Sequence, residues 1–204
     1  MRAPCSGVIP VYVEEKWSYY DYAAGKYSLI GYDDASSFID GIAAVKKDGT
    51  WRLINTQGEY VCDTRFDDIK LHGNGDYAFE NVMVAKENGT YGLYDAKGNT
   101  ISEFRCKDAD AFYGEPIAYQ DNSGKWGYVD SKGEVVHSPE FDEVKSFSHG
   151  LAAVRTDNGW GYMNELYKVV IEGKYYDADY FTEDGVVMVS EMEGLYHVLK
   201  LRFA

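Results

Sequence analysis

The feature that most constrains the fold of this chain is a short pattern that recurs along nearly all of its 204 residues. In each copy an aromatic anchor residue follows a tight turn. The anchors are Trp17, Trp51, Tyr91, Trp126 and Trp160, with Leu195 in the last place. Subtraction of neighbouring positions gives spacings of 34, 40, 35, 34 and 35 residues. A period of this size is typical of repeat arrays, in which each unit buries its apolar face against its neighbours.

Each copy predicts three short strands in a meander. An apolar run such as Leu151–Val154 leads to an Asn-Gly or Asp-Gly pair, which supplies the positive backbone angles of a tight hairpin turn. The anchor strand follows, then a second turn such as Lys132-Gly133 and a third run. An aromatic-acidic pair, for example Phe141-Asp142, closes the copy. No window of helical period survives this punctuation, so the chain is predicted to be all-β.

Six such units fill the sequence, and we interpret residues 1–204 as a single repeat domain. The spacing of 40 reflects an insertion, Leu71–Asp76, which reads as a surface loop. Six units agree with a propeller-like ring, which has about four to eight blades. The period is shorter than the roughly 40–50 residues of typical blades. An open, twisted β array is therefore the alternative to a ring. The predicted units are about 7–38, 39–79, 80–112, 113–147, 148–181 and 182–204.

The net charge of −14 restricts the partners. Nucleic acid and anionic membranes would be repelled over most of the surface, whereas a basic protein segment would be attracted. No apolar run approaches the length of a membrane span. The sequence leaves the compartment open: secreted or at the cell surface if a signal peptide was removed, otherwise cytoplasmic. Cys5, Cys62 and Cys106 are widely spaced and imply no disulfide framework, and Cys106 is expected to be a small core residue.

Units four and five carry motifs that resemble a known family. They contain Lys125–Asp130 (KWGYVD) with Gly133, Gly159–Tyr162 (GWGY), and Phe141–Val144 (FDEV) followed by Phe147–Val154 (FSHGLAAV). These motifs are similar to those of the bacterial WG-repeat, or KWG-repeat, family. The resemblance implies a β-repeat scaffold that acts as an interaction module and carries no catalytic residues. The other units diverge, for example to Trp51-Arg52, Tyr91-Gly92 and Leu195-Tyr196.

The tyrosines are the candidate binding residues. The anchors Trp17, Trp51, Tyr91, Trp126 and Trp160 are interpreted as structural, because a residue fixed in every unit has a packing role. The Gly after the anchor is expected to allow a close approach of a neighbouring backbone or ring. Alternation along a strand places Tyr19 on the face opposite Tyr20 and Tyr22, so that some of these rings are exposed. With the crowded fifth unit, the predicted binding set is Tyr19, Tyr20, Tyr22, Tyr175 and Tyr180.

Metal and catalytic chemistry find little support. Acidic pairs such as Asp33-Asp34 and Asp67-Asp68 lack a calcium-loop pattern, and turn capping is the favoured reading. The four histidines share no ligand spacing. No nucleophile elbow or phosphate loop occurs. We therefore expect no cofactor, no metal and no catalytic residue. The predicted function is a non-enzymatic scaffold for protein or peptide interaction; the alternative is a carbohydrate-binding surface or secreted protein that uses exposed aromatic rings.

Overall fold

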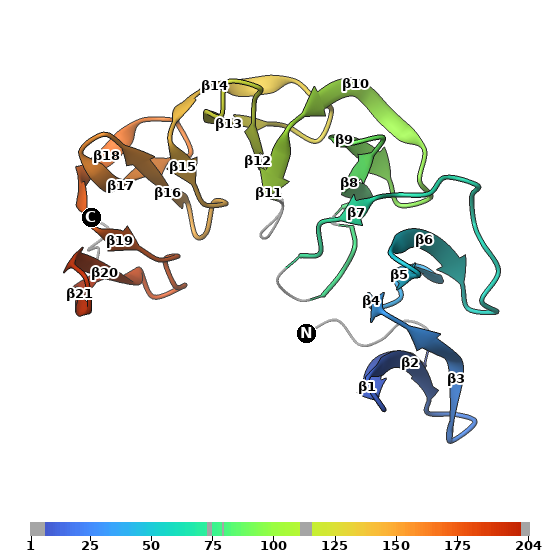
Figure 1. Ribbon diagram of the computed structural model, residues 1–204. Helices are drawn as coiled ribbons and strands as arrows, with labels where there is room; N and C mark the ends of the chain where they lie inside the picture. The colour runs from blue at the N-terminus through green and yellow to red at the C-terminus, as the bar shows by residue number, and fades with distance from the viewer. Residues whose placement is uncertain (1–6, 73–74, 79, 111–115, 201–204) are drawn as a thin grey trace. The chain divides into compact units, whose positions relative to one another are not determined.

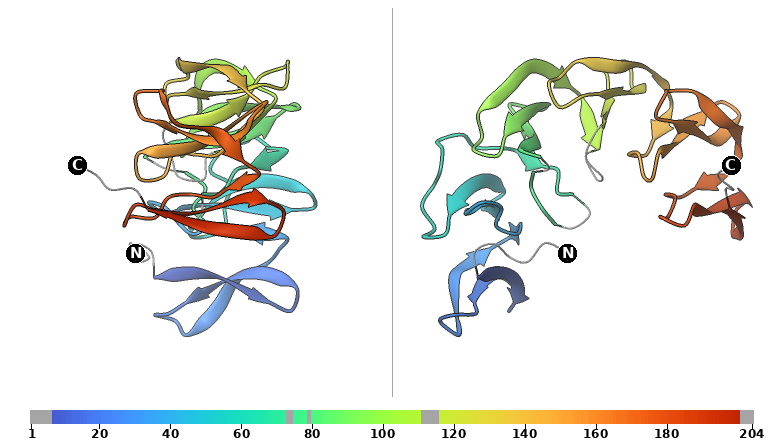
Figure 2. Two further views of the ribbon diagram at one scale, coloured as in Figure 1. Left: turned by 90° about the vertical axis from the view of Figure 1, so that its left-hand side faces the viewer. Right: turned by 180° about the vertical axis from the view of Figure 1, so that it is seen from behind.

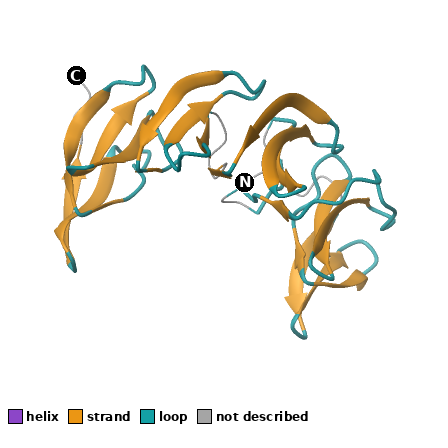
Figure 3. Ribbon diagram, turned by 45° about the horizontal axis from the view of Figure 1, so that its top comes forward, coloured by secondary structure: helices purple, strands orange, loops and turns teal. Residues whose placement is uncertain are grey.

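The computed structural model describes residues 7–72, 75–78, 80–110 and 116–200, and every regular element in these ranges is a β-strand (Figure 3). The chain divides into two compact units between Arg105 and Cys106. Each unit contains three small antiparallel sheets, numbered first to sixth along the chain (Figure 1). The predictions of an all-β chain and of six tandem repeats are confirmed.

The first unit holds the first, second and third sheets. Their strand orders are β1-β2-β3, β4-β5-β6 and β10-β9-β8-β7. The strands are β1 (Val8–Val13), β2 (Lys16–Asp21), β3 (Lys26–Tyr32), β4 (Asp34–Ala35), β5 (Ile42–Lys47), β6 (Thr50–Asn55), β7 (Asp68–Ile69), β8 (Val82–Glu87), β9 (Thr90–Asp95) and β10 (Thr100–Cys106).

The second unit repeats this plan. Its three sheets, coloured from yellow-green to red in Figure 2, have the strand orders β11-β12-β13-β14, β15-β16-β17-β18 and β19-β20-β21. The strands are β11 (Asp108–Asp110), β12 (Ile117–Gln120), β13 (Trp126–Val129), β14 (Val135–Phe141), β15 (Glu143–Val144), β16 (Leu151–Thr156), β17 (Gly159–Asn164), β18 (Val169–Tyr175), β19 (Asp177–Ala178), β20 (Val186–Met192) and β21 (Leu195–Lys200).

The sheets are out of phase with the predicted sequence units. A short strand that the sequence analysis did not predict opens each sheet after the first. Except at the third sheet, which follows a loop, a single residue separates this strand from the outer strand of the preceding sheet. Only Asp33 separates β3 from β4, and only Asp142 separates β14 from β15. The residues after the aromatic-acidic pair therefore belong to the next sheet. Of the predicted unit boundaries, Phe79 and residue 112 lie outside the described residues, as do Cys5 and part of the insertion loop.

Within each unit, the core lies between consecutive sheets. Antiparallel partners in register point to the same face of a sheet. We call the face that contacts the next sheet in the chain the forward face, and the opposite one the backward face. In the fifth sheet, Ala153 and Tyr162 are paired on the forward face, and Ala152 and Met163 on the backward face. In the described chain, four apolar clusters join forward to backward faces, two in each unit.

The residue two positions after the anchor is the centre of the forward face. Tyr19, Tyr128 and Tyr162 occupy this place and are buried. Each hydroxyl donates to the backbone carbonyl 17 residues later: Tyr19 to Ser36 (2.9 Å), Tyr128 to Lys145 (3.0 Å) and Tyr162 to Asp179 (2.9 Å). These acceptors belong to the next sheet. The repeat therefore ties neighbouring sheets together by a polar bond inside an apolar interface, and burial raises the pKa of all three phenols.

The Gly after the anchor is required by the third strand, as predicted. A Cβ at Gly127 would lie 2.5 Å from the carbonyl oxygen of His137 and 2.7 Å from the nitrogen of Pro139. A Cβ at Gly161 would lie even closer to the carbonyl oxygen of Ile171 in β18. In the second sheet Arg52 takes this place, because a loop replaces the outer strand there. The Arg52 guanidinium lies 3.8 Å from the centre of the Tyr60 ring and donates to the carbonyl of Cys62 at 3.3 Å.

The sixth sheet corrects the assignment of its anchor. In the fifth sheet Trp160 pairs with Arg155, and in the second Trp51 pairs with Lys46. The equivalent pair of the sixth sheet is Tyr196 with Ser190. The hairpin contains a register shift between Ser190 and Met192, which adds a residue before the anchor strand. Tyr196, and not Leu195, therefore stands in the anchor place.

Candidate functional site

The predicted tyrosines of the first sheet divide between core and surface. Tyr19 is fully buried between the first and second sheets, so its ring is not available at the surface. Tyr20 and Tyr22 lie on the opposite, backward face, as alternation predicted, and Tyr22 is 60% exposed. Tyr27 joins them from β3, is 50% exposed and is paired in register with Tyr20. The sequence analysis did not select Tyr27, although it lies in the same tyrosine-rich stretch.

Tyr20, Tyr22 and Tyr27 form a tyrosine cluster at the surface. The Tyr20 ring centre lies 5.4 Å from that of Tyr22 and 5.2 Å from that of Tyr27, both edge to face. This geometry is the favoured one for aromatic pairs and orders the rings before any partner arrives. In the second and fifth sheets the place of Tyr20 is taken by Ile54 and Met163, which the preceding sheet buries. Tyr20 thus occupies a core position that is only half-buried in the first sheet.

The predicted tyrosines of the second unit also divide. Tyr175 is buried at the end of β18 against the sixth sheet. Tyr180 is half-buried, and the Lys145 ammonium lies 5.2 Å from its ring centre. The exposed ring is that of Tyr176, which separates β18 from β19. Burial of Tyr19 and Tyr175 corrects the expectation that these two rings face solvent: both stand at places where two sheets meet.

A pocket of about 560 Å³ opens beside Tyr176 in the second unit. The Lys174 ammonium lies 5.0 Å from the Tyr175 ring centre, and Arg155 pairs with Glu143. The pocket thus joins an exposed ring to a mixed polar wall. The lining residues are Arg155, Thr156, Asp157, Asn158, Gly159, Lys174, Tyr175, Tyr176, Asp177 and Glu191.

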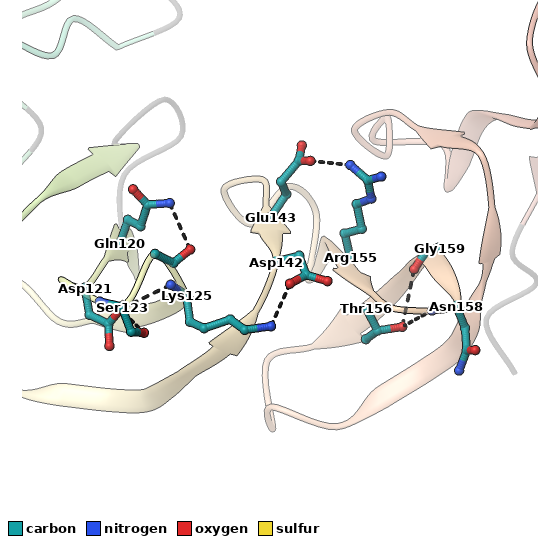
Figure 4. A network of polar contacts seen from close by, with 11 residues as sticks. Gln120, Asp121, Ser123, Lys125, Asp142, Glu143, Arg155, Thr156, Asn158 and Gly159 are labelled. Atoms are coloured by element: carbon teal, nitrogen blue, oxygen red, sulfur yellow. Dashed lines mark hydrogen bonds and ion pairs between the residues drawn. The ribbon is translucent and has the colours of Figure 1, made fainter.

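The polar network next to this pocket explains the acidic pairs (Figure 4). Lys125, just before the anchor, contacts Asp142 at 2.6 Å, and this hydrogen bond raises the pKa of Lys125. Lys16 and Asp33 make the equivalent contact at 2.5 Å in the first sheet, where the bond from Lys16 lowers the pKa of Asp33. In both cases the acid stands 17 residues after the lysine. The lysine of the repeated motif therefore holds the acid that follows the outer strand.

An aspartate at the first position of the short opening strand caps that strand in three sheets. Asp34, Asp108 and Asp177 each accept a hydrogen bond from the backbone N–H of the next residue, at 2.8–2.9 Å. Asp67 accepts from the backbone N–H of Gly89, in the hairpin turn of the next sheet. Asp67 therefore caps a turn, as predicted, whereas Asp34, Asp108 and Asp177 cap strands. Among the described residues, no His, Cys, Asp or Glu side chains gather in a group of three that could hold a metal ion.

The anchors are packing residues to different degrees. Trp51, Tyr91 and Trp160 are buried, whereas Trp17 and Trp126 are half-buried. Tyr91 also donates to Asp68 at 2.5 Å, and the Lys70 ammonium lies 4.8 Å from its ring centre. Cys106 is buried, as predicted, and neither it nor the half-buried Cys62 is in a disulfide. No helix within the described ranges has the length and apolarity needed to span a bilayer.

Comparison with known proteins identifies the repeat. A family model described as the WG containing repeat matches residues 30–51, 91–124, 126–160 and 160–196. No curated protein sequence matches significantly. Among solved structures, Hsv2p of Kluyveromyces lactis matches with a TM-score of 0.55 and 11% identity over 95% of this chain and 71% of that chain. Hsv2 of Kluyvelomyces marxianus has a TM-score of 0.55 and 11% identity, with coverages of 91% and 70%.

A third similar structure is the dihydro-heme d1 dehydrogenase NirN in complex with DHE, with a TM-score of 0.53 and 12% identity. The match covers 98% of this chain and 53% of that chain. At such low identities these likenesses concern the fold alone. They place the small antiparallel sheets of this chain among β-propeller-like structures.

Proposed function

Since this chain belongs to the family of WG-repeat proteins, we propose that it is a non-enzymatic interaction module that binds a protein segment through the tyrosine cluster of its first sheet. The observation that carries the proposal is the exposure of Tyr22 and Tyr27 beside Tyr20, whose equivalents Ile54 and Met163 in other sheets are buried. Ordered tyrosine rings offer a large contact area at a small entropy loss, and tyrosine is enriched in protein interfaces.

The charge of the chain favours a basic partner. A net charge of −14 attracts lysine- and arginine-rich segments and accelerates their association. Arginine and lysine also bind over tyrosine rings through cation–π contacts. Arg52 over Tyr60 and Lys145 over Tyr180 show this contact within the chain itself. A basic segment would therefore be attracted by the negative charge of the molecule and could also form cation–π contacts with the tyrosine cluster.

The test is an array of short lysine- and arginine-rich peptides, with glutamate-rich peptides of equal length as the negative set. Tyr22→Ser and Tyr27→Ser should each weaken binding about tenfold, as expected for loss of a hot-spot ring. Tyr12→Ser is the matched control, because Tyr12 is an exposed tyrosine of the same sheet that contacts Trp17 on the other face. Added salt should weaken binding of the basic peptides.

Three outcomes would overturn the proposal. Equal losses in the Tyr12 and Tyr22 variants would remove the cluster from the binding site. Binding of neutral glycans, abolished by Tyr22→Ser while basic peptides fail to bind, would establish the alternative of a carbohydrate-binding protein. Turnover of chromogenic glycosides by the wild-type chain, lost on substitution of a pocket carboxylate such as Asp177→Asn, would show that the chain is an enzyme.

A further inference from the structure

The forward face of the sixth sheet is an uncovered sheet-packing surface. In the fifth sheet the forward-face residues Ala153, Trp160 and Tyr162 are all buried by the sheet that follows. Their equivalents in the sixth sheet are Met188, Tyr196 and Val198, which are 49%, 54% and 67% exposed. Met188 and Val198 are paired in register, so they form one continuous apolar patch. The forward face of the sixth sheet thus has residues equivalent to those of an internal sheet–sheet interface, but no described sheet follows to cover them.

The backward face of the first sheet is the complementary surface. In the second sheet the backward-face pair Ala43 and Ile54 is buried against the sheet before it. The equivalent pair in the first sheet is Ile9 and Tyr20, both only half-buried. Tyr22 and Tyr27 enlarge this face. Within each unit, forward faces pack on backward faces, whereas residues on the forward face of the sixth sheet and on the backward face of the first sheet are exposed.

We propose that these two surfaces bind each other between copies of the chain, the sixth sheet of one copy packing on the first sheet of a second. The four sheet–sheet clusters within the chain join faces of these same two types. The partner is therefore another sheet of the same repeat, and every copy carries both halves of the contact. Such a contact is heterologous and builds rings or filaments, because each bound copy leaves one free face of each kind.

The side chains fit this contact. Met188 is a flexible residue that adapts to ring surfaces, and Val198 takes the place of Tyr128 and Tyr162 in the fourth and fifth sheets. The first sheet of the second copy carries tyrosine rings on its backward face. The smaller side chain on the sixth sheet is therefore matched by larger side chains on the first sheet. The net charge of −14 on each copy opposes association. Added salt should therefore strengthen self-association, the reverse of its effect on a basic peptide.

The test is sedimentation velocity of the full chain from micromolar to submillimolar concentration, at low and high salt. The wild-type chain should gain mass with concentration, more at high salt. Val198→Glu blocks the forward face and Tyr27→Glu blocks the backward face, so each variant alone should remain monomeric. Mixed together, they should form a one-to-one dimer and nothing larger, because each retains one intact face. Leu166→Glu is the control, since it adds the same charge at an exposed turn residue outside both faces.

Each outcome decides the matter. A wild-type chain that stays monomeric at all concentrations and salts overturns the proposal. Self-association of Tyr27→Glu alone would show contact between two sixth sheets, and self-association of Val198→Glu alone contact between two first sheets; either overturns the heterologous pairing. Circular dichroism of each variant excludes misfolding as a cause. Val198→Glu lies outside the tyrosine cluster, so it should retain basic-peptide binding, which keeps this test separate from that of the proposed function.

Discussion

Replacing Gly127 by Ala tests directly how closely the third strand approaches the anchor strand. Real Cβ atoms essentially never come within 3.0 Å of such a backbone atom, yet the added Cβ would lie 2.5 Å from the His137 carbonyl oxygen. Strand β14 must therefore move by about half an ångström or more in a close-packed sheet. Pro139 stiffens the strand at this point, because its ring fixes φ. Forced shifts of this kind destabilise by about 1–3 kcal/mol.

Gly92→Ala is the matched control in the same place of the third sheet. There the three atoms nearest to the added Cβ would all belong to the Arg105 side chain, at 3.0–3.3 Å. The guanidinium can swing aside, and Ala in place of a strand Gly stabilises by roughly 0.5–1 kcal/mol. We therefore expect Gly92→Ala to be neutral or slightly stabilising, and Gly127→Ala to destabilise its unit by about 2 kcal/mol.

The measurement is urea unfolding monitored by hydrogen exchange and mass spectrometry, which reports the unfolding of the two units separately. Far-UV circular dichroism checks that both variants fold. Equal effects of the two substitutions on the free energy of unfolding would refute the reasoning, because steric contact with the β14 backbone could then not be the reason for Gly127. A neutral Gly127→Ala would do the same.

Three further predictions follow from the buried contacts. Tyr162→Phe should lower the free energy of unfolding by about 1 kcal/mol, because the Asp179 carbonyl loses its buried donor; the exposed Tyr176→Phe is the control, and equal losses in urea unfolding would contradict this. Burial, together with the hydrogen bond to Glu87, raises the pKa of Tyr94 from 10.0 to about 12. The neutral phenol is favoured in the folded state, so its contribution is complete below pH 10 and is lost as the pH rises through about 12. Tyr94→Phe should therefore flatten the alkaline loss of stability, and identical slopes in both proteins would refute the assignment. Arg52→Ala should speed alkylation of Cys62 severalfold while buried Cys106 stays slow, because the guanidinium holds the loop through Cys62 and Tyr60; an unchanged rate by mass spectrometry would show that Arg52 does not restrain the loop.

Local patterns in the sequence predicted the features that depend on neighbouring residues. The Gly pairs of the hairpin turns and the spacing of Trp126 and Trp160 are visible without a structure, because turn geometry and period are local properties. Alternation correctly separated Tyr19 from Tyr20 and Tyr22. The close approach at Gly127 could be inferred, because a glycine within a strand, next to an anchor, commonly marks a place where another backbone comes near.

Other features were hidden because they depend on how sheets meet. A two-residue strand such as Asp34–Ala35 has no periodicity, so its place in the next sheet could not be predicted. Tyr196 was missed as an anchor because one extra hairpin residue shifts the register. The burial of Tyr175 and the exposure of Tyr176 depend on the sixth sheet, whose position relative to the fifth no local pattern encodes.

The phase of the strands has a consequence for how such chains can be cut, joined and lengthened. The residue between two sheets, such as Asp33 or Asp142, is the one point where a break leaves every sheet with all its own strands. A break after Phe38 or Phe147 would instead leave β4 or β15 on the wrong fragment and remove an edge strand from the following sheet. Gene duplication, domain fusion and fragment design should therefore place the junction at this single residue, which is Asp33, Lys107, Asp142 or Tyr176. A new repeat inserted at that residue contains its own opening strand. A repeat inserted after Phe38 or Phe147 would instead depend on the preceding repeat for its opening strand.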